Sequence, residues 1–327
     1  MSIYDTIIIG GGPAGLSAGL YAARAGLRSL LLEKSFLGGQ AITADRIENY
    51  PGFPEPISGL KIIQNMEEQA RKYNLAIVVR EVKSLEAKEG KFRIYLEGGL
   101  EGELEPELEN KLENGPENGG LLLSQTVIVA TGASPIRLNV PGEAEFTGRG
   151  VSYCATCDGP LFRDREVVVV GGGNSAVEEA LFLAKFARKV TIVHRRSALR
   201  ADKILQDRAF QNPKIHFLWN SVVQEIKGDS QVRAVSLQDL TSRSLTTQPT
   251  DGLFIYVGSK PNTAWLPPAV KLDDKGFIIT DERLSSSLAG LFAAGDCRQK
   301  PLRQIITAAS DGALAGMMAY HYLQEKT

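Results

Sequence analysis

Two cysteines and an aspartate stand out in the sequence for the chemistry that they could do: Cys154, Cys157 and Asp158, in the segment CATCD. Two cysteines separated by two residues can close a small disulfide ring and open it again. Because so short a ring constrains the unfolded chain very little, the pair suits electron exchange better than structural cross-linking. We therefore predict that Cys154 and Cys157 exchange electrons.

A strand, a glycine turn and a helix are predicted at the start of the chain. Residues 4–9 (YDTIII) are typical of a buried strand, and GGGPAG at 10–15 leads into a helix rich in small residues. Gly10, Gly12 and Gly15 have the GxGxxG spacing, which permits a tight turn, the approach of a pyrophosphate and close packing of helix on strand. Glu33 ends the next predicted strand, where a carboxylate can bind both hydroxyls of a ribose. This unit is predicted to bind an adenine dinucleotide that lacks a 2′-phosphate.

A second unit of the same kind follows the cysteines. EVVVV at 166–170 runs into GGGNSA at 171–176, and the distance from Gly171 to His194 equals that from Gly10 to Glu33, 23 positions. Where the first unit has its acid, the second has His194-Arg195-Arg196, followed by Arg200. Arginine can bind a 2′-phosphate with two hydrogen bonds, so this unit is predicted to bind NADP(H). The alternative is a basic segment that binds only water.

Other segments predict loops and elements around these units. Turn residues at 38–40 and 48–54 predict ordered loops that wrap a ligand. A strand at 290–297 runs into Gly-Asp, where Asp296 can bind a ribityl or phosphate-bearing chain. Further strands are expected at 75–79, 82–85, 92–96 and 124–130, and helices at 60–73 and 303–323. Residues 97–120, rich in glutamate, glycine and asparagine, predict a flexible acidic insertion.

The composition is that of an ordinary globular protein. The chain has 327 residues, enough for two domains, with 43% hydrophobic residues and a net charge of −1. This charge gives no reason to expect nucleic acid or an anionic membrane as a partner. With only three cysteines and neither a signal peptide nor a long apolar run, we expect a cytoplasmic protein. The third cysteine, Cys297, is expected to be a small buried residue.

Taken together, these motifs resemble the low-molecular-weight, bacterial-type thioredoxin reductases. The motifs that carry the resemblance are GGGPAG at 10–15, GGQ at 38–40, ENYPG at 48–52, ATGA at 130–133, CATCD at 154–158, GGGNSAVEEAL at 171–181, HRRSALRA at 194–201, GLFAAGD at 290–296 and RQI at 303–305. The resemblance implies an α/β fold of two Rossmann-like dinucleotide-binding domains. A discontinuous FAD domain would span 1–135 and 261–327, and an NADPH domain at 136–260, which contains the two cysteines, would be inserted in it.

The resemblance also implies roles for individual residues. Cys157 would lie against the flavin, Cys154 would be its disulfide partner, and Asp158 would handle protons, since the attacking sulfur must be a thiolate and the leaving one must be protonated. FAD contacts are implied at Gly12, Glu33, Gln40, Asn49, Asp296 and Gln304, and NADPH contacts at Ser175, His194, Arg195, Arg196 and Arg200. The other residues of these cofactor-binding motifs are Gly10, Pro13, Ala14, Gly15, Gly39, Ala130, Thr131, Gly132, Gly295, Arg303 and Ile305 for FAD, and Gly171, Gly173, Asn174 and Ala176 for NADPH.

The implied activity is reduction of thioredoxin, or of a thioredoxin-like protein, by NADPH through FAD and the disulfide, in a homodimer. Pro160 and Leu161 stand where the family often has aromatic residues that touch thioredoxin, and Ser259 stands where relatives often have histidine. Two alternatives are a flavoenzyme fed by ferredoxin, which is expected to lack the arginines, and a redox sensor without activity, which would not need the cysteines and Asp158. A zinc site is disfavoured because the three histidines and Cys297 lack ligand spacing.

Overall fold

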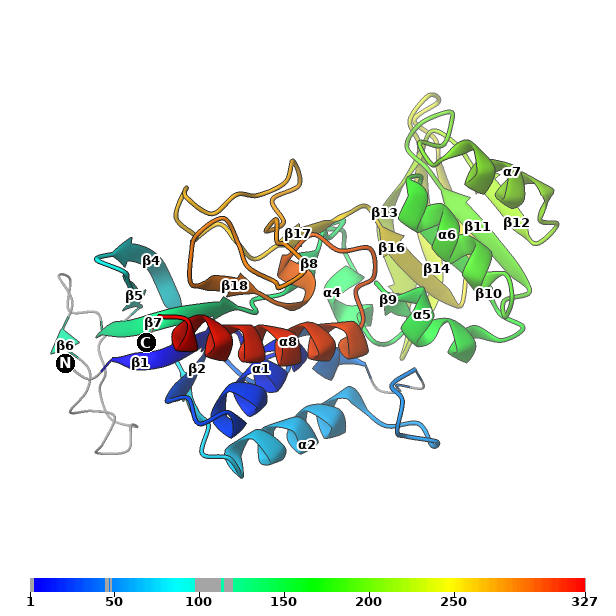
Figure 1. Ribbon diagram of the computed structural model, residues 1–327. Helices are drawn as coiled ribbons and strands as arrows, with labels where there is room; N and C mark the ends of the chain where they lie inside the picture. Colours follow the sequence, from blue (N-terminus) through cyan, green and yellow to red (C-terminus); the bar gives the residue numbers. More distant parts are fainter. Residues whose placement is uncertain (1–2, 45–46, 48, 98–112, 115–119, 327) are drawn as a thin grey trace. The chain divides into compact units, whose positions relative to one another are not determined.

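The computed structural model describes residues 3–44, 47, 49–97, 113–114 and 120–326, and they form two compact units (Figure 1). The described residues of the first unit lie within 1–43, 50–134 and 260–327, and those of the second within 44–49 and 135–259. The chain thus passes from the first unit to the second and returns. The two crossing segments, β8 (Ala133–Pro135) and β17 (Ser259–Pro261), pair as a two-stranded sheet.

The first unit is built on a mixed sheet with the order β3-β2-β1-β7-β5-β4. β1 (Tyr4–Ile9) is parallel to β2 (Ser29–Glu33) and to β7 (Gly120–Val129), and β2 is parallel to β3 (Ala76–Val79). β18 (Leu291–Ala293) adds a further parallel strand beside the end of β7. The beginning of β7 pairs with the antiparallel strands β5 (Lys91–Leu96) and β6 (Glu113–Asn114), and β5 pairs with β4 (Val82–Lys88).

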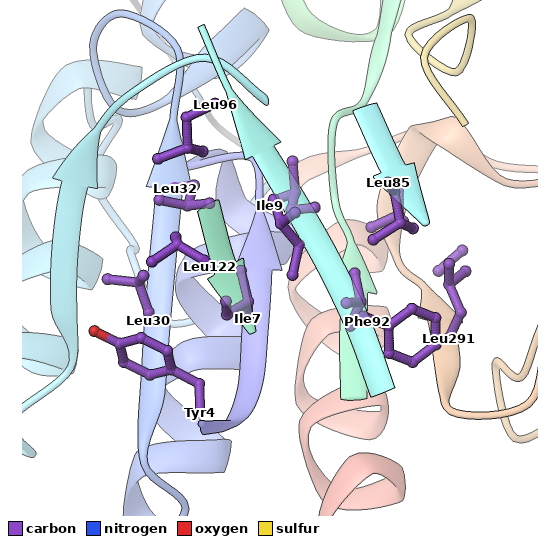
Figure 2. Packing of buried hydrophobic residues seen from close by; sticks show 14 of the residues in the cluster. Tyr4, Ile7, Ile9, Leu30, Leu32, Leu85, Phe92, Leu96, Leu122 and Leu291 are labelled. Atoms are coloured by element: carbon purple, nitrogen blue, oxygen red, sulfur yellow. The ribbon is translucent and has the colours of Figure 1, made fainter. Parts of the chain in front are cut away.

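Successive residues of the central strands enter two different cores. Ile7 and Ile9 of β1 and Leu30 of β2 pack with Phe92 on one face of the sheet (Figure 2). Ile8, between them in the sequence, packs on the opposite face against the helices. Both faces are covered, which explains why these strands are continuously apolar rather than alternating.

Three helices cover that opposite face: α1 (Pro13–Arg24), α2 (Gly59–Arg71) and α8 (Ile305–Gln324) (Figure 1). α8 packs closely along α1. A Cβ atom at Gly312 would lie 2.1 Å from the carbonyl oxygen of Ala14, and one at Gly316 would lie 2.7 Å from that of Ala18. Glycine at these two positions therefore lets the two backbones touch.

The second unit has a parallel sheet with the order β12-β11-β10-β16-β9. Its strands are β9 (Val151–Ser152), β10 (Glu166–Gly171), β11 (Lys189–Val193), β12 (Ile215–Leu218) and β16 (Gly252–Tyr256). Helices α6 (Asn174–Leu183) and α7 (Lys203–Gln211) pack on the face that contains Val167 and Val169. Val168 and Val170 face an antiparallel sheet of β13 (Ser221–Gly228), β14 (Val232–Asp239) and β15 (Leu245–Pro249).

Short elements complete the two units. The first unit contains the 3-10 turns η1 (Gly39–Thr43) and η3 (Gly295–Cys297). The second contains α4 (Glu143–Phe146), α5 (Ala155–Asp158) and the 3-10 turn η2 (Gly159–Phe162). The two cysteines of CATCD thus lie at a short helix directly after β9.

Most predicted elements are present, with corrected ends. The last helix begins at Ile305 and not at Arg303, because Gln304 caps it: its backbone N–H donates to Oγ1 of Thr307 at 3.1 Å, and its side chain binds the first turn in return. The strand expected at 290–297 covers only Leu291–Ala293, since Gly295 turns the chain with a φ of +77°. The strand expected at 124–130 begins earlier, at Gly120. Most of the predicted acidic insertion lies outside the described residues; Glu113–Asn114 within it forms β6.

Candidate active site

The two cysteines of CATCD form a disulfide in the second unit. The sulfurs of Cys154 and Cys157 are bonded, and their Cα atoms lie 5.3 Å apart. Cys154 caps α5, with its sulfur accepting a hydrogen bond from the backbone N–H of Cys157 at 3.2 Å. Both residues are half-buried. The structure therefore contains the predicted pair in its oxidised form, on a turn that keeps the two sulfurs together.

Ser152 links Asp158 to the cysteine turn. Its hydroxyl donates a hydrogen bond of 2.6 Å to Oδ2 of Asp158 and accepts one of 3.1 Å from the backbone N–H of Cys154. Ser152 is buried and its two partners are half-buried, so these bonds are partly shielded from water. Sequence analysis did not identify this serine, and its place two residues before Cys154 was the only signal.

Tyr256 is a second residue that sequence analysis missed. It ends β16, and its hydroxyl accepts a hydrogen bond from the backbone N–H of Ala155, between the two cysteines. Burial, followed by the charge of Glu179, raises the pKa of Tyr256 well above its usual value, so the phenol stays protonated. Tyr256 thus anchors the turn from the neighbouring strand without carrying a charge.

The first glycine turn has the geometry of a pyrophosphate cradle. Gly10 has a φ of +111°, and a Cβ atom there would lie 2.4 Å from the carbonyl oxygen of Ala130. A Cβ at Gly15 would lie 1.7 Å from the carbonyl oxygen of Gly10, whereas one at Gly12 would meet only Gly38, at 3.9 Å. The space beside Gly12 at the start of α1 is therefore open, as an incoming phosphate requires.

Glu33 lies over the same turn. Its Oε2 accepts a hydrogen bond of 2.7 Å from the backbone N–H of Gly11, and its Oε1 accepts one of 3.2 Å from Ser35. The backbone N–H of Gly38 donates to Gly11 at 2.9 Å, which brings η1, with Gly39 and Gln40, beside the turn. Glu33 and Gln40, both predicted to contact FAD, thus lie beside the same glycine turn of the first unit.

Asp296 and Arg303 contribute buried polar atoms without a partner. Within the described ranges, Oδ1 of Asp296 and Nε of Arg303 are buried and form no hydrogen bond. Burial raises the pKa of Asp296, and the charges of Lys300 and Arg303 oppose that rise. The guanidinium of Arg303 lies 4.2 Å from the centre of the Phe277 ring. Such unsatisfied buried groups are typical of a site that binds a polar ligand.

Asp311, on α8, holds the Gly295 turn and was also missed. Its Oδ2 accepts hydrogen bonds from the backbone N–H of Gly295 at 3.0 Å, from Nε of Arg298 at 2.8 Å and from Nζ of Lys300 at 2.7 Å. Burial alone would raise its pKa, but the hydrogen bonds and charges of Arg298 and Lys300 outweigh burial and lower it. A single acid among the small residues of α8 was the available signal.

The second glycine turn repeats the first one in the second unit. Gly171 has a φ of +151°, and nothing lies within 4 Å of a Cβ built at Gly173. Asn174 begins α6, and its side chain exchanges two hydrogen bonds of 2.8 Å with Asp202. Asn174 therefore fixes the loop that carries the arginines, and its contact with NADPH stays a prediction.

His194 and the arginines lie at this turn. His194 is buried against Gly172, and its Nε2 has no partner among the described residues. Burial, followed by the charges of Arg200, Arg195 and Arg196, lowers the pKa of His194. The arginines are exposed, and the backbone N–H of Arg200 donates to Gly172 at 2.7 Å. A cationic surface thus borders the start of α6.

Asn49, Thr131, Gln304 and Cys297 complete the predicted set. Asn49 is exposed in the segment 44–49, which groups with the second unit, so its FAD contact stays a prediction. Thr131 donates to the backbone carbonyl of Asn262 at 2.8 Å. Gln304 caps α8. Cys297 is fully buried, as predicted, and burial raises its pKa to about 11.

Two absences concern only the part of the chain that the structure describes. No three histidine, cysteine, aspartate or glutamate residues there gather as metal ligands would. None of the helices described is both long and apolar enough to cross a bilayer.

Comparison with known proteins identifies the family. The profile of the pyridine nucleotide-disulphide oxidoreductases matches residues 4–312. The thioredoxin reductase of Peptoclostridium acidaminophilum is 43% identical, covering 99% of this chain and 98% of its own, and that of Listeria monocytogenes is 44% identical, covering 99% and 95%. The crystal structure of thioredoxin reductase from Streptococcus pyogenes has a TM-score of 0.87 at 45% identity, covering 99% of both chains.

The chain belongs to the bacterial-type thioredoxin reductases, within the pyridine nucleotide-disulphide oxidoreductases. The predicted fold class is confirmed. This family uses FAD and NADPH. The open cradle at Gly12 and the unpartnered buried atoms of Asp296 and Arg303 fit a flavin dinucleotide, and the arginines beside the second turn fit a 2′-phosphate.

Proposed function

We propose that this protein is an NADPH-dependent thioredoxin reductase, in which electrons pass from NADPH through FAD to the Cys154–Cys157 disulfide and then to oxidised thioredoxin. One observation carries the proposal: the disulfide lies beside Asp158 in a fold that contains two separate dinucleotide turns. A sensor would need no such disulfide, and a ferredoxin-fed enzyme would not need the three arginines.

In this proposal the first unit binds FAD. The backbone at Gly12 and the start of α1 bind the pyrophosphate, and Glu33 binds the ribose hydroxyls. Asp296, and Arg303 and Gln304 at the start of α8, bind the remaining polar chain. The flavin, when bound, carries the two electrons that NADPH supplies as hydride. The buried Oδ1 of Asp296 supports these roles, because it has no hydrogen-bond partner among the described residues.

The second unit binds NADPH. The backbone at Gly173 and Ser175, at the start of α6, would bind the pyrophosphate of NADPH, and Arg195, Arg196 and Arg200 would bind its 2′-phosphate. His194 is held neutral by burial and by the neighbouring cations, so its open Nε2 can hydrogen-bond without adding charge. The cationic surface described above gives this site its preference for NADPH over NADH.

The residues around the disulfide manage protons. Reduction takes up two electrons and two protons and leaves two thiols. One thiol then loses its proton, and the thiolate attacks the disulfide of thioredoxin, forming a mixed disulfide. The second sulfur displaces thioredoxin as a dithiol, and the Cys154–Cys157 bond forms again. Asp158, held in place by Ser152, is the group that accepts and returns the proton.

The partner, the assembly and the location are part of the same proposal. The protein serves thioredoxin or a thioredoxin-like protein, acts as a homodimer and resides in the cytoplasm. A reducing compartment suits a disulfide that must be opened in each cycle. Light scattering of the purified protein at several concentrations measures the assembly, and a monomer at every concentration contradicts the dimer.

An anaerobic titration tests the electron path. We expect NADPH to bleach the flavin absorbance of the purified protein, and oxidised thioredoxin to restore it. Cys157→Ser should still bleach with NADPH but should not reduce thioredoxin. Reduced ferredoxin as the only donor that bleaches the flavin would overturn the NADPH assignment. Recovery of thioredoxin turnover in Cys157→Ser would overturn the role of the disulfide.

A further inference from the structure

Glu179 is a half-buried carboxyl group next to the cysteine turn that the proposed mechanism does not use. It lies on α6, the helix that follows the second glycine turn, and α5 packs against this helix. Within the described ranges, its Oε2 is buried and has no hydrogen-bond partner. An acid of this kind is costly to bury on a helix that needs only apolar contacts there.

Glu179 is connected to the middle of the cysteine turn from two sides. The side chain of Thr156, which lies between the two cysteines, hydrogen-bonds its carboxyl group. The hydroxyl of Tyr256 accepts the hydrogen bond from Ala155, and the charges of both Glu179 and Asp158 raise the pKa of this hydroxyl. Glu179 and Tyr256 thus interact with the middle of a motif in which two thiols are made and consumed.

The charged groups around Glu179 favour its neutral form. Glu178 is beside it on α6, and its charge acts on Glu179. Asp158, on α5, acts together with Glu179 on the hydroxyl of Tyr256. On the neighbouring helix α7, the charge of Lys203 is paired with that of Asp207, with 2.7 Å between Nζ and Oδ1, and both side chains are exposed. Burial, followed by the charge of Glu178, raises the pKa of Glu179 to about 6, against the opposing effect of the Thr156 hydrogen bond. The group therefore changes charge close to neutral pH.

We propose that Glu179 is a positioning residue of the redox site, which acts through Thr156 and through its charge to set the pH range in which the reduced Cys154–Cys157 pair is nucleophilic. When Glu179 is ionised, its negative charge disfavours a thiolate nearby, because like charges raise the pKa of a neighbouring acid. When it is protonated, the thiolate forms more readily. This inference deepens the proposed function and rests on the disulfide being the electron carrier.

Alkylation of the reduced protein tests this role without thioredoxin or NADPH. The holoenzyme is reduced with dithiothreitol, freed of reductant, and treated with iodoacetamide between pH 5 and 9. For the unaltered protein we expect a profile with an inflection near pH 6 from Glu179, below the main rise that reports the thiol. Glu179→Gln should lose this inflection and react about threefold faster at pH 7.5, corresponding to a thiol pKa lower by about half a unit.

Two further variants complete the experiment. Glu178→Gln, on the exposed side of the same helix, should keep the inflection but move it to lower pH, because the charge of Glu178 raises the pKa of Glu179. Thr156→Val should move it to higher pH, because the hydrogen bond that lowers the pKa of Glu179 is gone. The proposal is overturned if Glu179→Gln gives the same pH profile as the unaltered protein. If Glu179→Gln does not fold, an inflection at the same pH in Thr156→Val as in the unaltered protein overturns it. A protein that shows the inflection but cannot reduce thioredoxin would contradict the proposed function alone.

Discussion

The hydroxyl of Ser152 donates a 2.6 Å hydrogen bond to Oδ2 of Asp158 while it accepts one from the backbone N–H of Cys154. One buried serine therefore orients the proposed proton-handling group and the first cysteine together.

Ser152→Ala should slow thioredoxin reduction without preventing flavin reduction by NADPH. A lost hydrogen bond to a charged group costs about 1.5–3 kcal/mol, which corresponds to roughly tenfold or more in turnover. Steady-state assays with thioredoxin and stopped-flow bleaching with NADPH measure the two steps. Ser236→Ala, at another buried serine of the same unit, is the control. A Ser152→Ala protein with normal thioredoxin turnover would contradict the bridging role.

Arg195→Ala combined with Arg196→Ala should raise the KM for NADPH about tenfold or more and leave the KM for NADH nearly unchanged. The reason is that a charge-assisted pair to phosphate is lost only with the phosphorylated dinucleotide. Initial rates with both dinucleotides measure the effect. Arg188→Ala removes an exposed arginine that pairs with Glu166 at 2.8 Å, and it should change neither value. Equal losses for NADPH and NADH would mean that the pair does not bind the 2′-phosphate.

Asp311→Asn should weaken FAD binding and lower the stability of the first unit. The variant leaves Lys300, whose side chain is only 4% exposed, without its anionic partner, and breaking a buried pair in this way costs about 3–5 kcal/mol. Because the pKa of Asp311 is lowered, its stabilising effect is present above the usual carboxyl pKa and is lost as the pH falls through the lowered value. Thermal unfolding at pH 7 and pH 3, with flavin release, measures both effects, and Asp274→Asn at an exposed position is the control. Unfolding curves that coincide at pH 7 would contradict this role.

Glu179→Gln should stabilise the second unit at pH 8 by about 1–2 kcal/mol, a value reduced for the partial exposure of the side chain. The pKa of Glu179 is raised to about 6 in the folded protein, so its stabilising effect is present below its unfolded pKa and disappears as the pH rises through 6. Urea unfolding at pH 5 and pH 8 measures the difference. The gain should shrink at pH 5, where the carboxyl group is mostly protonated. A gain of equal size at both pH values would mean that charge is not its cause.

The sequence was sufficient to predict the turns, because their chemistry is local. Gly10 and Gly171 have positive φ values that exclude most other residues, and the spacing to Glu33 and His194 follows from one strand–helix–strand repeat. The cysteine pair is similarly local.

The residues that support these turns could not be found in the same way. Tyr256 meets Ala155 across 101 positions, and Asp311 meets Gly295 across 16, so each contact depends on how strands and helices are ordered in space. Nothing in its residue type distinguishes Glu179 from Glu178, and only the packing of α5 on α6 relates it to the cysteines. The predicted start of the last helix was wrong for a related reason. Gln304 caps this helix, and glutamine is not a residue type from which an N-cap is predicted.

The packing of α8 on α1 through Gly312 and Gly316 has a consequence for biosynthesis. The helix that follows the first glycine turn is covered by α8, which leaves the ribosome after the whole second unit, and β18 joins the sheet only shortly before α8. Most of the second unit, residues 135–259, is a continuous stretch that is complete by then. The redox unit can thus fold during translation. In the first unit, by contrast, an apolar face of α1 and of the sheet stays exposed until α8 is synthesised, and exposed apolar surface of this kind is what chaperones bind.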